Sequence, residues 1–322
     1  MSDAAPVRTP NLKARLPVAQ RARQLKGFWS TNRWLILRRL SQAGVLALFL
    51  AGPLFGVWIV KGTLASSMTL NVLPLTDPFL LLQSLVARHW PEGLAIIGAA
   101  IVFAFYALVS GRAYCAWVCP INPVTDAAHW LHARLGLGKG WQPKPNTRYF
   151  VMGAVLAVSA LTGTIAFELI NPITAAYRAI LFGGAWAFGL VAAVFLFDLF
   201  VSRRGWCSHL CPVGACYGLI GSKSLVRVVA PRREACDDCL DCYAVCPEPH
   251  VITPALRGAG KGVAPVILGR DCTACGRCID VCSEDVFRFS HRFDKREERV
   301  APSAEAIRLS APQGEPDLRG TT

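Results

Sequence analysis

Four long apolar runs constrain the fold of this 322-residue chain more than any other feature. They cover about 40–60, 93–110, 150–167 and 181–201, and none contains Lys, Arg or His. Each is close to the roughly 20 residues that a helix needs to cross about 30 Å of hydrocarbon. Only 17% of the chain is charged, against about a quarter in soluble domains. We therefore predict an all-α polytopic membrane domain of four transmembrane helices over residues 40–220.

Basic residues predict the orientation of these helices. Residues 1–43 carry nine basic side chains and one acidic side chain, Asp3, and further basic residues lie between the second and third runs and directly after the fourth. Short loops rich in Lys and Arg remain in the cytoplasm. We expect a multi-pass protein of the cell inner membrane with a basic cytoplasmic segment at 1–39. The net charge of +13 is assigned to contact with the lipid bilayer, since no nucleic-acid-binding motif is present.

Arg38 and Arg39 precede the first run, as in a twin-arginine export signal. The run is long, lacks a clear small-residue cleavage site and is followed by three more, so a retained helix is the simpler interpretation.

Eight cysteines after the apolar region have bacterial ferredoxin spacing. The pattern is Cys236-x2-Cys239-x2-Cys242-x3-Cys246-Pro247, repeated as Cys272-x2-Cys275-x2-Cys278-x3-Cys282. In ferredoxins the first three cysteines of a run bind one 4Fe-4S cluster and the fourth binds the other. The prediction is two clusters, with ligands Cys236, Cys239, Cys242 and Cys282 in one and Cys272, Cys275, Cys278 and Cys246 in the other. Zinc sites or disulfides are disfavoured by the interleaved spacing and the cytoplasmic location.

These cysteines define a small α+β ferredoxin-like domain over 221–295, followed by a flexible tail at 296–322. Its expected strands lie within SLVRVVA (224–230), VAPVIL (263–268) and VFRFSHRF (286–293).

A second set of cysteines forms two CxxxCP motifs, Cys115-x3-Cys119-Pro120 and Cys207-x3-Cys211-Pro212. They lie in a weak internal repeat, 111–123 and 203–215, and we expect them on the cytoplasmic side, at the inner ends of the second and fourth helices. Spacing of i, i+4 places two sulfurs on one helix face. Together the pairs offer four thiolates for a further metal centre, a redox dithiol or a quinol site. Packing of buried cysteines is the alternative.

Histidine placement limits the redox chemistry. Because the four runs contain no His and the chain contains no Cys-x-x-Cys-His, the sequence predicts neither haem b within the membrane nor haem c. No protein-bound electron path across the bilayer is therefore evident within the chain. His209 lies between Cys207 and Cys211 and is a candidate to exchange a proton with quinol near neutral pH. Its alternative role is an interfacial one.

The motifs together resemble the NapH family, ferredoxin-type membrane subunits of the periplasmic nitrate reductase system. The resemblance covers nearly the whole chain and rests on RWLILRRL, AGPLFGVWIV, CAWVCPINPVTD, GWCSHLCPVGACYG and CGRCIDVCSEDVF. It implies a quinol dehydrogenase component that works with the periplasmic iron–sulfur protein NapG. Electrons would pass, directly or through a tetrahaem cytochrome, to the nitrate reductase subunits NapA and NapB.

The predicted function is quinol oxidation near the inner ends of the second and fourth helices, with the clusters as one-electron acceptors. Such an electron-transfer subunit would be inactive without its partners. A second hypothesis is a redox maturation factor that keeps the cofactor or thiols of a periplasmic metalloenzyme reduced. Similar modules in methylamine-utilisation and nitrous-oxide-reductase accessory proteins support it. A passive membrane anchor with structural clusters is the third.

Overall fold

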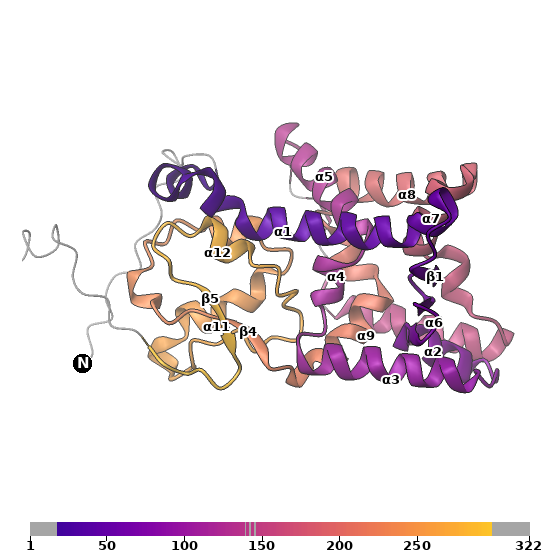
Figure 1. Ribbon diagram of the computed structural model, residues 1–322. Coiled ribbons are helices and arrows are strands. Elements are labelled where there is room, and N and C mark those ends of the chain that lie inside the picture. The colour runs from indigo at the N-terminus through magenta and orange to yellow at the C-terminus, as the bar shows by residue number, and fades with distance from the viewer. Residues whose placement is uncertain (1–17, 139, 142, 145, 298–322) are drawn as a thin grey trace, which may run out of the picture.

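A computed structural model describes residues 18–138, 140–141, 143–144 and 146–297. Expectations for the first 17 residues and for the tail beyond residue 297 concern residues outside this part. The described chain is mostly helical, as predicted, with a helical bundle at one end and a smaller cysteine-rich unit at the other (Figure 1).

Helix α1 (Gln20–Phe55) joins the two ends of the molecule (Figure 1). Its backbone is interrupted at Gly27, and Gly56 ends it in the left-handed conformation. Of the described helices, α1 alone is long and apolar enough to cross a membrane by itself. Its first half packs along helix α12 (Arg277–Val281) of the cysteine-rich unit, and its second half enters the bundle.

The other apolar runs form shorter helices than expected. They are α3 (Gly93–Leu108), α6 (Thr147–Thr162) and α8 (Ala185–Leu196), the last continuing as a π-helical turn to Val201. Left-handed residues Gly163 and Gly183 end α6 and the preceding helix α7 (Pro172–Phe182), so the runs at 150–167 and 181–201 are each interrupted. The end of the run at 40–60 leaves the helix and enters strand β1 (Val60–Gly62).

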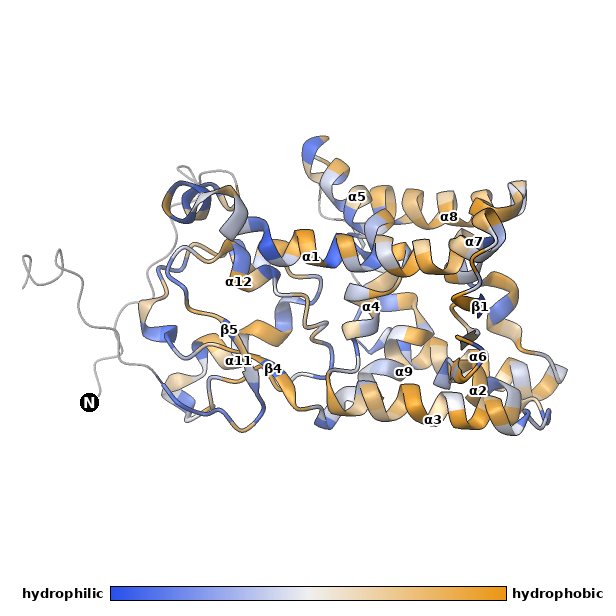
Figure 2. Ribbon diagram, viewed as in Figure 1, coloured by the Kyte–Doolittle hydropathy of each residue, from blue (hydrophilic) through white to orange (hydrophobic). Residues whose placement is uncertain are grey.

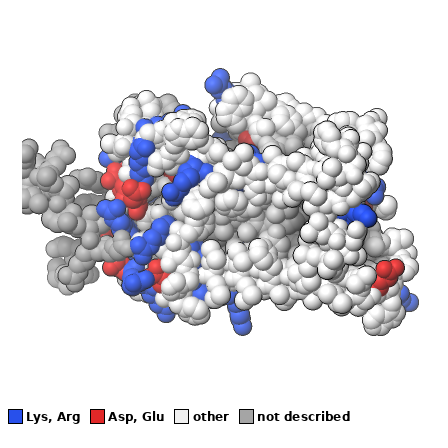
Figure 3. All heavy atoms as spheres, viewed as in Figure 1, with Lys and Arg blue, Asp and Glu red and all other residues white. Residues whose placement is uncertain are grey.

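The outer surface of the bundle is apolar. Leu161, Phe182 and Trp186 are 73–87% exposed, and the bundle is predominantly hydrophobic along its helices (Figure 2). On the face shown in Figure 3, charged side chains gather over the cysteine-rich end and are sparse over the bundle. An apolar surface of this extent requires lipid or protein to cover it.

The internal repeat is larger than the 13 residues visible in the sequence. Helices α2 (Pro78–Val86) and α7 both begin with proline after a capping side chain, since Asp77 accepts a hydrogen bond from the Phe79 amide and Asn171 one from the Ile173 amide. The apolar helices α3 and α8 follow, then the CxxxCP motifs. Each repeat thus consists of a capped short helix, an apolar helix and a cysteine pair.

The first cysteine pair lies around α4 (Ala113–Trp117), before α5 (Ile121–Arg134); the second lies around a π-helical turn (Trp206–Leu210), before α9 (Pro212–Ile220). A three-stranded antiparallel sheet of β1, β2 (Ser66–Thr69) and β3 (Leu73–Thr76) connects α1 to α2. Both cysteine pairs therefore follow the apolar helices at the end that faces the cysteine-rich unit.

The cysteine-rich unit is built on strands β4 (Val226–Val229) and β5 (Arg288–His291), which pair antiparallel with Val226 opposite His291. Two of the three expected strands are thus confirmed, whereas VAPVIL contributes only an isolated bridge at Val266. Short helices α10 (Asp241–Val245), α11 (Ile252–Arg257) and α12 complete the unit. Its core combines apolar side chains with the cysteines themselves.

Candidate functional site

Four cysteines, Cys236, Cys239, Cys242 and Cys282, line one cavity and are called the first quartet. Asp238 and Leu240 have positive φ angles, which tighten the loop so that three of these cysteines turn inward. The fourth, Cys282, comes from the end of α12, and its sulfur accepts the Val286 amide at 3.4 Å. The structure therefore brings together the four residues that the spacing assigned to one cluster.

The second quartet is Cys246, Cys272, Cys275 and Cys278, which line a separate cavity. Ala274 and Gly276 have positive φ angles and close this loop as Asp238 and Leu240 close the other. Cys246 follows α10, which carries it away from the first quartet. Burial raises the pKa of Cys272 to about 11. The thiol therefore remains protonated unless a bound metal replaces the proton.

The third quartet is Cys115, Cys119, Cys207 and Cys211, contributed by the two CxxxCP motifs. Although the pairs are far apart in the chain, all four side chains line one cavity with Tyr114, Ile121, Ile173, Trp206, Val213 and Gly214. Cys119 and Cys211 are both buried. Among the described residues, no three His, Cys, Asp or Glu side chains are grouped as ligands of a single metal ion. In all three quartets the sulfurs surround a cavity.

Helix α1 holds the first CxxxCP loop. Arg38 Nε and Gln42 Nε2 donate to the Ala116 carbonyl at 3.1 and 2.8 Å, and Ser41 Oγ donates to the Trp117 carbonyl at 2.9 Å. Because these donors are three and four residues apart, they lie on one face of α1. In the sequence, Arg38 and Arg39 predicted membrane orientation, resembled an export signal and belonged to the RWLILRRL motif, but the contacts of this region with backbone carbonyls have no signature there.

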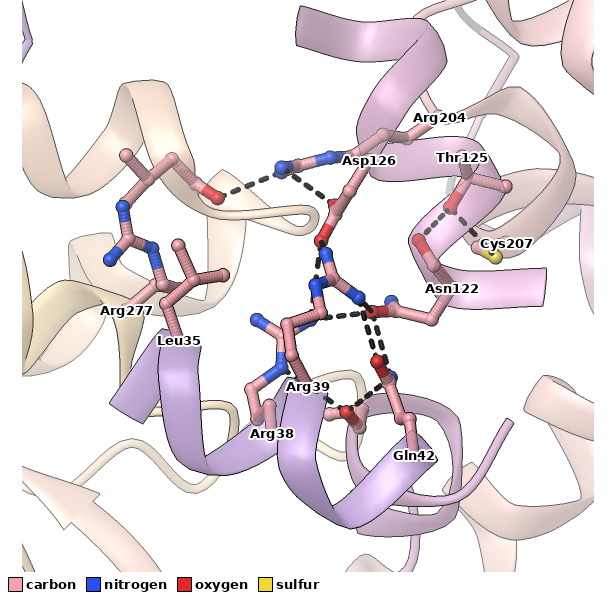
Figure 4. Close-up of polar contacts among 12 residues, drawn as sticks. Leu35, Arg38, Arg39, Gln42, Asn122, Thr125, Asp126, Arg204, Cys207 and Arg277 are labelled. Carbon is pink, nitrogen blue, oxygen red and sulfur yellow. Dashed lines mark hydrogen bonds and ion pairs between the residues drawn. The ribbon is translucent and has the colours of Figure 1, made fainter. Parts of the chain in front are cut away.

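Asp126 forms ion pairs with three guanidinium groups beside the third quartet (Figure 4). Arg39 and Arg38 lie 2.5 and 3.3 Å from Oδ2, and Arg204 lies 3.1 Å from Oδ1. Burial alone would raise the pKa of Asp126, but the three cations lower it below its usual value. This ion cluster fixes α1, α5 and the start of the second CxxxCP segment to one another.

Arg112 connects the third quartet to the second. Its buried guanidinium donates to Glu248 Oε1 at 2.8 Å, to the Asp271 carbonyl at 2.7 Å and to the Cys207 carbonyl at 3.1 Å. Arg148 Nη1 also donates to Glu248 Oε1, at 2.8 Å. Glu248 lies two residues after Cys246, and Asp271 directly precedes Cys272, so both belong to segments of the second quartet, whereas Cys207 belongs to the third. The Arg112 side chain therefore contacts segments of both the second and the third quartet.

A larger, open cavity of about 540 Å³ borders the second quartet at Cys246. His129 and His209 both line it, and the Nδ1 atom of each is buried without a hydrogen-bond partner. Burial, reinforced by Arg204, lowers the pKa of His129 to about 4, so its imidazole is neutral at pH 7. His129 was missed from the sequence because it stands in no motif and reaches this cavity only through the packing of α5.

Comparisons with known proteins identify the class of this chain. A family model described as a 4Fe-4S binding domain matches residues 92–138 and 182–229, the two segments that contain the CxxxCP motifs. The chain is 47% identical to the ferredoxin-type protein NapH of Haemophilus influenzae over 273 residues, 85% of this chain and 95% of that protein. No solved structure matches it.

Two further relatives are equally similar. NapH of Escherichia coli is 47% identical over 272 residues, 84% of this chain and 94% of that protein. The methylamine utilization ferredoxin-type protein MauN of Paracoccus denitrificans is 50% identical over 273 residues, 84% of this chain and 95% of that protein. The fold and the matches define a membrane-associated iron–sulfur protein of the electron-transfer class. The chain belongs to the NapH family of ferredoxin-type proteins, as the sequence motifs indicated.

Proposed function

We propose that this chain oxidises quinol at the cytoplasmic face of the inner membrane and passes the electrons through two 4Fe-4S clusters, held by the first and second quartets, to partner proteins. The observation that carries the proposal is the open cavity. It places two buried, unpartnered imidazole nitrogens, of His129 and His209, in the same space as the cluster ligand Cys246.

The chemistry follows from these groups. A quinol hydroxyl donates a hydrogen bond, and a neutral imidazole nitrogen accepts one. Oxidation of quinol to quinone releases two electrons and two protons. The histidine nitrogens are positioned to accept protons, and Cys246 with the other cysteines of the second quartet would hold a cluster that supplies one-electron chemistry beside them. The two-electron donor is thereby divided into single-electron steps.

The proposed membrane arrangement uses the four apolar helices α1, α3, α6 and α8 as spans. The first half of α1, the cysteine-rich unit and the CxxxCP motifs then share the cytoplasmic side, because they lie at the same end of the bundle (Figure 1). Clusters on this side cannot deliver electrons across the bilayer by themselves. Partner subunits complete the route, and resemblance to the NapH family favours NapG and then the NapA and NapB nitrate reductase subunits, directly or through a tetrahaem cytochrome.

A second candidate function is redox maturation of a periplasmic metalloenzyme. The relative named for methylamine utilization supports it, since it is as similar to this chain as the NapH proteins are. Replacing Cys207 and Cys211 by Ser separates the two functions. Loss of quinol-linked turnover in an already assembled partner enzyme supports electron transfer, whereas loss confined to newly made partner enzyme supports maturation.

The direct test is anaerobic EPR of the detergent-solubilised chain before and after addition of a reduced quinol analogue, with dithionite as the reduction control. Quinol should generate the reduced-cluster signal. The His129→Gln variant should reduce slowly with quinol and normally with dithionite, while the exposed His291→Gln variant should behave as the wild type in both. A wild-type chain reduced by dithionite but not by quinol, even with the iron–sulfur partner added, would overturn the proposal.

A further inference from the structure

We propose that the third quartet, Cys115, Cys119, Cys207 and Cys211, binds a third 4Fe-4S cluster, so that the chain carries three clusters in line rather than two. This inference goes beyond the proposed function, which requires only the two ferredoxin clusters. It rests on the shape of the site, on the hydrogen bonds to its sulfurs and on its connection to the second quartet.

The three quartets surround small cavities of similar size. Their volumes are about 10, 20 and 20 Å³ for the first, second and third quartets. In each case four cysteines and mostly apolar neighbours form the wall. Cysteines that serve only to pack would fill the space between them, because protein interiors are close-packed. A site whose four-cysteine lining and cavity resemble those of two ferredoxin-spaced quartets is suited to the same kind of group.

Two sulfurs of the third quartet also receive the same kind of backbone hydrogen bond as sulfurs of the ferredoxin quartets. Cys119 accepts from the backbone N–H of Ile121, and Cys211 from that of Val213, each two residues further on. Cys246 accepts from Glu248 in the same i, i+2 arrangement. Backbone N–H groups directed at sulfur stabilise the thiolates of a bound cluster. The two copies of the repeat therefore present equivalent ligands.

Each repeat supplies half of this site. One CxxxCP motif offers two thiolates, and a 4Fe-4S cluster requires four. The packing of the two repeats brings the pairs together around Gly214, where an added Cβ would lie 3.9 Å from the Cys115 sulfur. Both halves also match the model described as a 4Fe-4S binding domain.

Contacts between the quartets set the order of the clusters. Arg112 contacts the Cys207 carbonyl, Glu248 and the Asp271 carbonyl, and Ser208 Oγ donates to the Pro247 carbonyl at 3.1 Å. The segment after Cys207 thus touches the segment after Cys246. The second quartet in turn shares its two cysteine runs with the first. The third site therefore lies next to the second, on the side of the helical bundle (Figure 1).

The test is iron and acid-labile sulfide per chain, with Mössbauer spectroscopy, on protein purified anaerobically. Three clusters give about twelve irons, and two give about eight. The double variant Cys119→Ser with Cys211→Ser should hold about eight, with the EPR signals of the ferredoxin clusters retained. The matched control is Cys216→Ser, a buried cysteine outside the cavity, which should keep about twelve.

About eight irons in the wild type overturns the proposal, as does zinc in the third quartet or a disulfide between its cysteines in the purified protein. The wild-type spectrum decides the matter even if the double variant fails to fold. Iron content is independent of quinol oxidation. Twelve irons without reduction by quinol would therefore reject the proposed function and leave the third cluster standing.

Discussion

The ferredoxin quartets and the third quartet reach similar geometry by different routes. In the first and second quartets, three ligands lie within seven residues of one another and only the fourth comes from the other run. The third quartet joins Cys115 and Cys207, which are 92 positions apart, and α1 braces its first loop from outside. The comparison shows that one kind of site is specified by loop spacing and the other by the docking of helices. Perturbations should therefore separate them.

Removal of iron should have the largest effect and should act unequally on the two regions. The core of the cysteine-rich unit is small and is built partly from cysteines, so cluster loss removes much of what organises it. We expect iron chelation under oxidising conditions to make the backbone amides of residues 221–295 exchange rapidly while those of the apolar helices remain protected. Hydrogen exchange with mass spectrometry measures both regions, with untreated protein as the control. Equal loss of protection in both would contradict the distinction.

Glu248→Gln should destabilise the junction between the second and third quartets. Arg112 and Arg148 both donate to this carboxylate, and all three side chains are almost fully buried. Removing one charge from a buried ion network costs about 3–5 kcal/mol. Thermal unfolding of the holoprotein measures the loss. The control is Glu284→Gln, whose partner Arg21 is half-exposed, and its effect should stay below about 1 kcal/mol. Similar losses of stability in Glu248→Gln and Glu284→Gln would contradict the view that Arg112 and Glu248 hold the second and third quartets together.

Gly276→Ala should loosen α1 from the cysteine-rich unit. Gly276 has φ +72, and an added Cβ would lie 2.5 Å from Trp34 Cγ on α1. Left-handed strain contributes about 1–2 kcal/mol and overpacking about 1–3 kcal/mol. Gly262→Ala is the matched control, since Gly262 has φ +68 with no atom near the added Cβ. The difference in the free energy of unfolding isolates the clash. If both variants lose the same stability, Trp34 does not brace this contact.

Local patterns explain why much of the fold and site could be predicted. Apolar runs located the helices α1, α3, α6 and α8, and the positions of Cys246 and Cys282 after their short helices follow from ferredoxin spacing. The capped helices α2 and α7 were missed, although Asp77-Pro78 and Asn171-Pro172 are recognisable helix starts. Helix α2 lies in a segment interpreted as a loop, and α7 ends inside the run at 181–201, which was interpreted as one continuous span. The break at Gly183 was therefore not anticipated.

Tertiary contacts account for the rest. Arg38 was assigned to membrane orientation because a charge count cannot show that its Nε binds the Ala116 carbonyl. His129 enters the open cavity only because α5 packs beside the segment of Arg204 and His209. Only the repeat linked the two cysteine pairs, and it gave no distance between them. Spacing predicts a site when its ligands share a loop, whereas convergence of separate helices has to be observed.

Thr125→Val should have the smallest effect and should act on the third quartet alone. Thr125 Oγ1 lies 3.7 Å from Cys207 Sγ and 3.1 Å from the Asn122 carbonyl, which also accepts from this hydroxyl (Figure 4). With a cluster bound, Cys207 is a thiolate and only threonine can donate, so its one hydrogen is shared between two acceptors. A hydrogen bond worth about 1 kcal/mol corresponds to about 40 mV for one electron. Because the Thr125 hydroxyl hydrogen is shared between two acceptors, the change in cluster potential in Thr125→Val should be smaller than about 40 mV.

Because hydrogen bonds to sulfur favour the reduced cluster, the Thr125→Val potential should fall. Redox titration followed by EPR should show this fall in one of three cluster potentials, with the other two unchanged. Exposed Thr162→Val, at the C-terminal end of α6, should change none of them. A shift in a ferredoxin potential instead would mean that Thr125 acts through the packing of α5 rather than through Cys207, and the two kinds of site would then not be electronically separable.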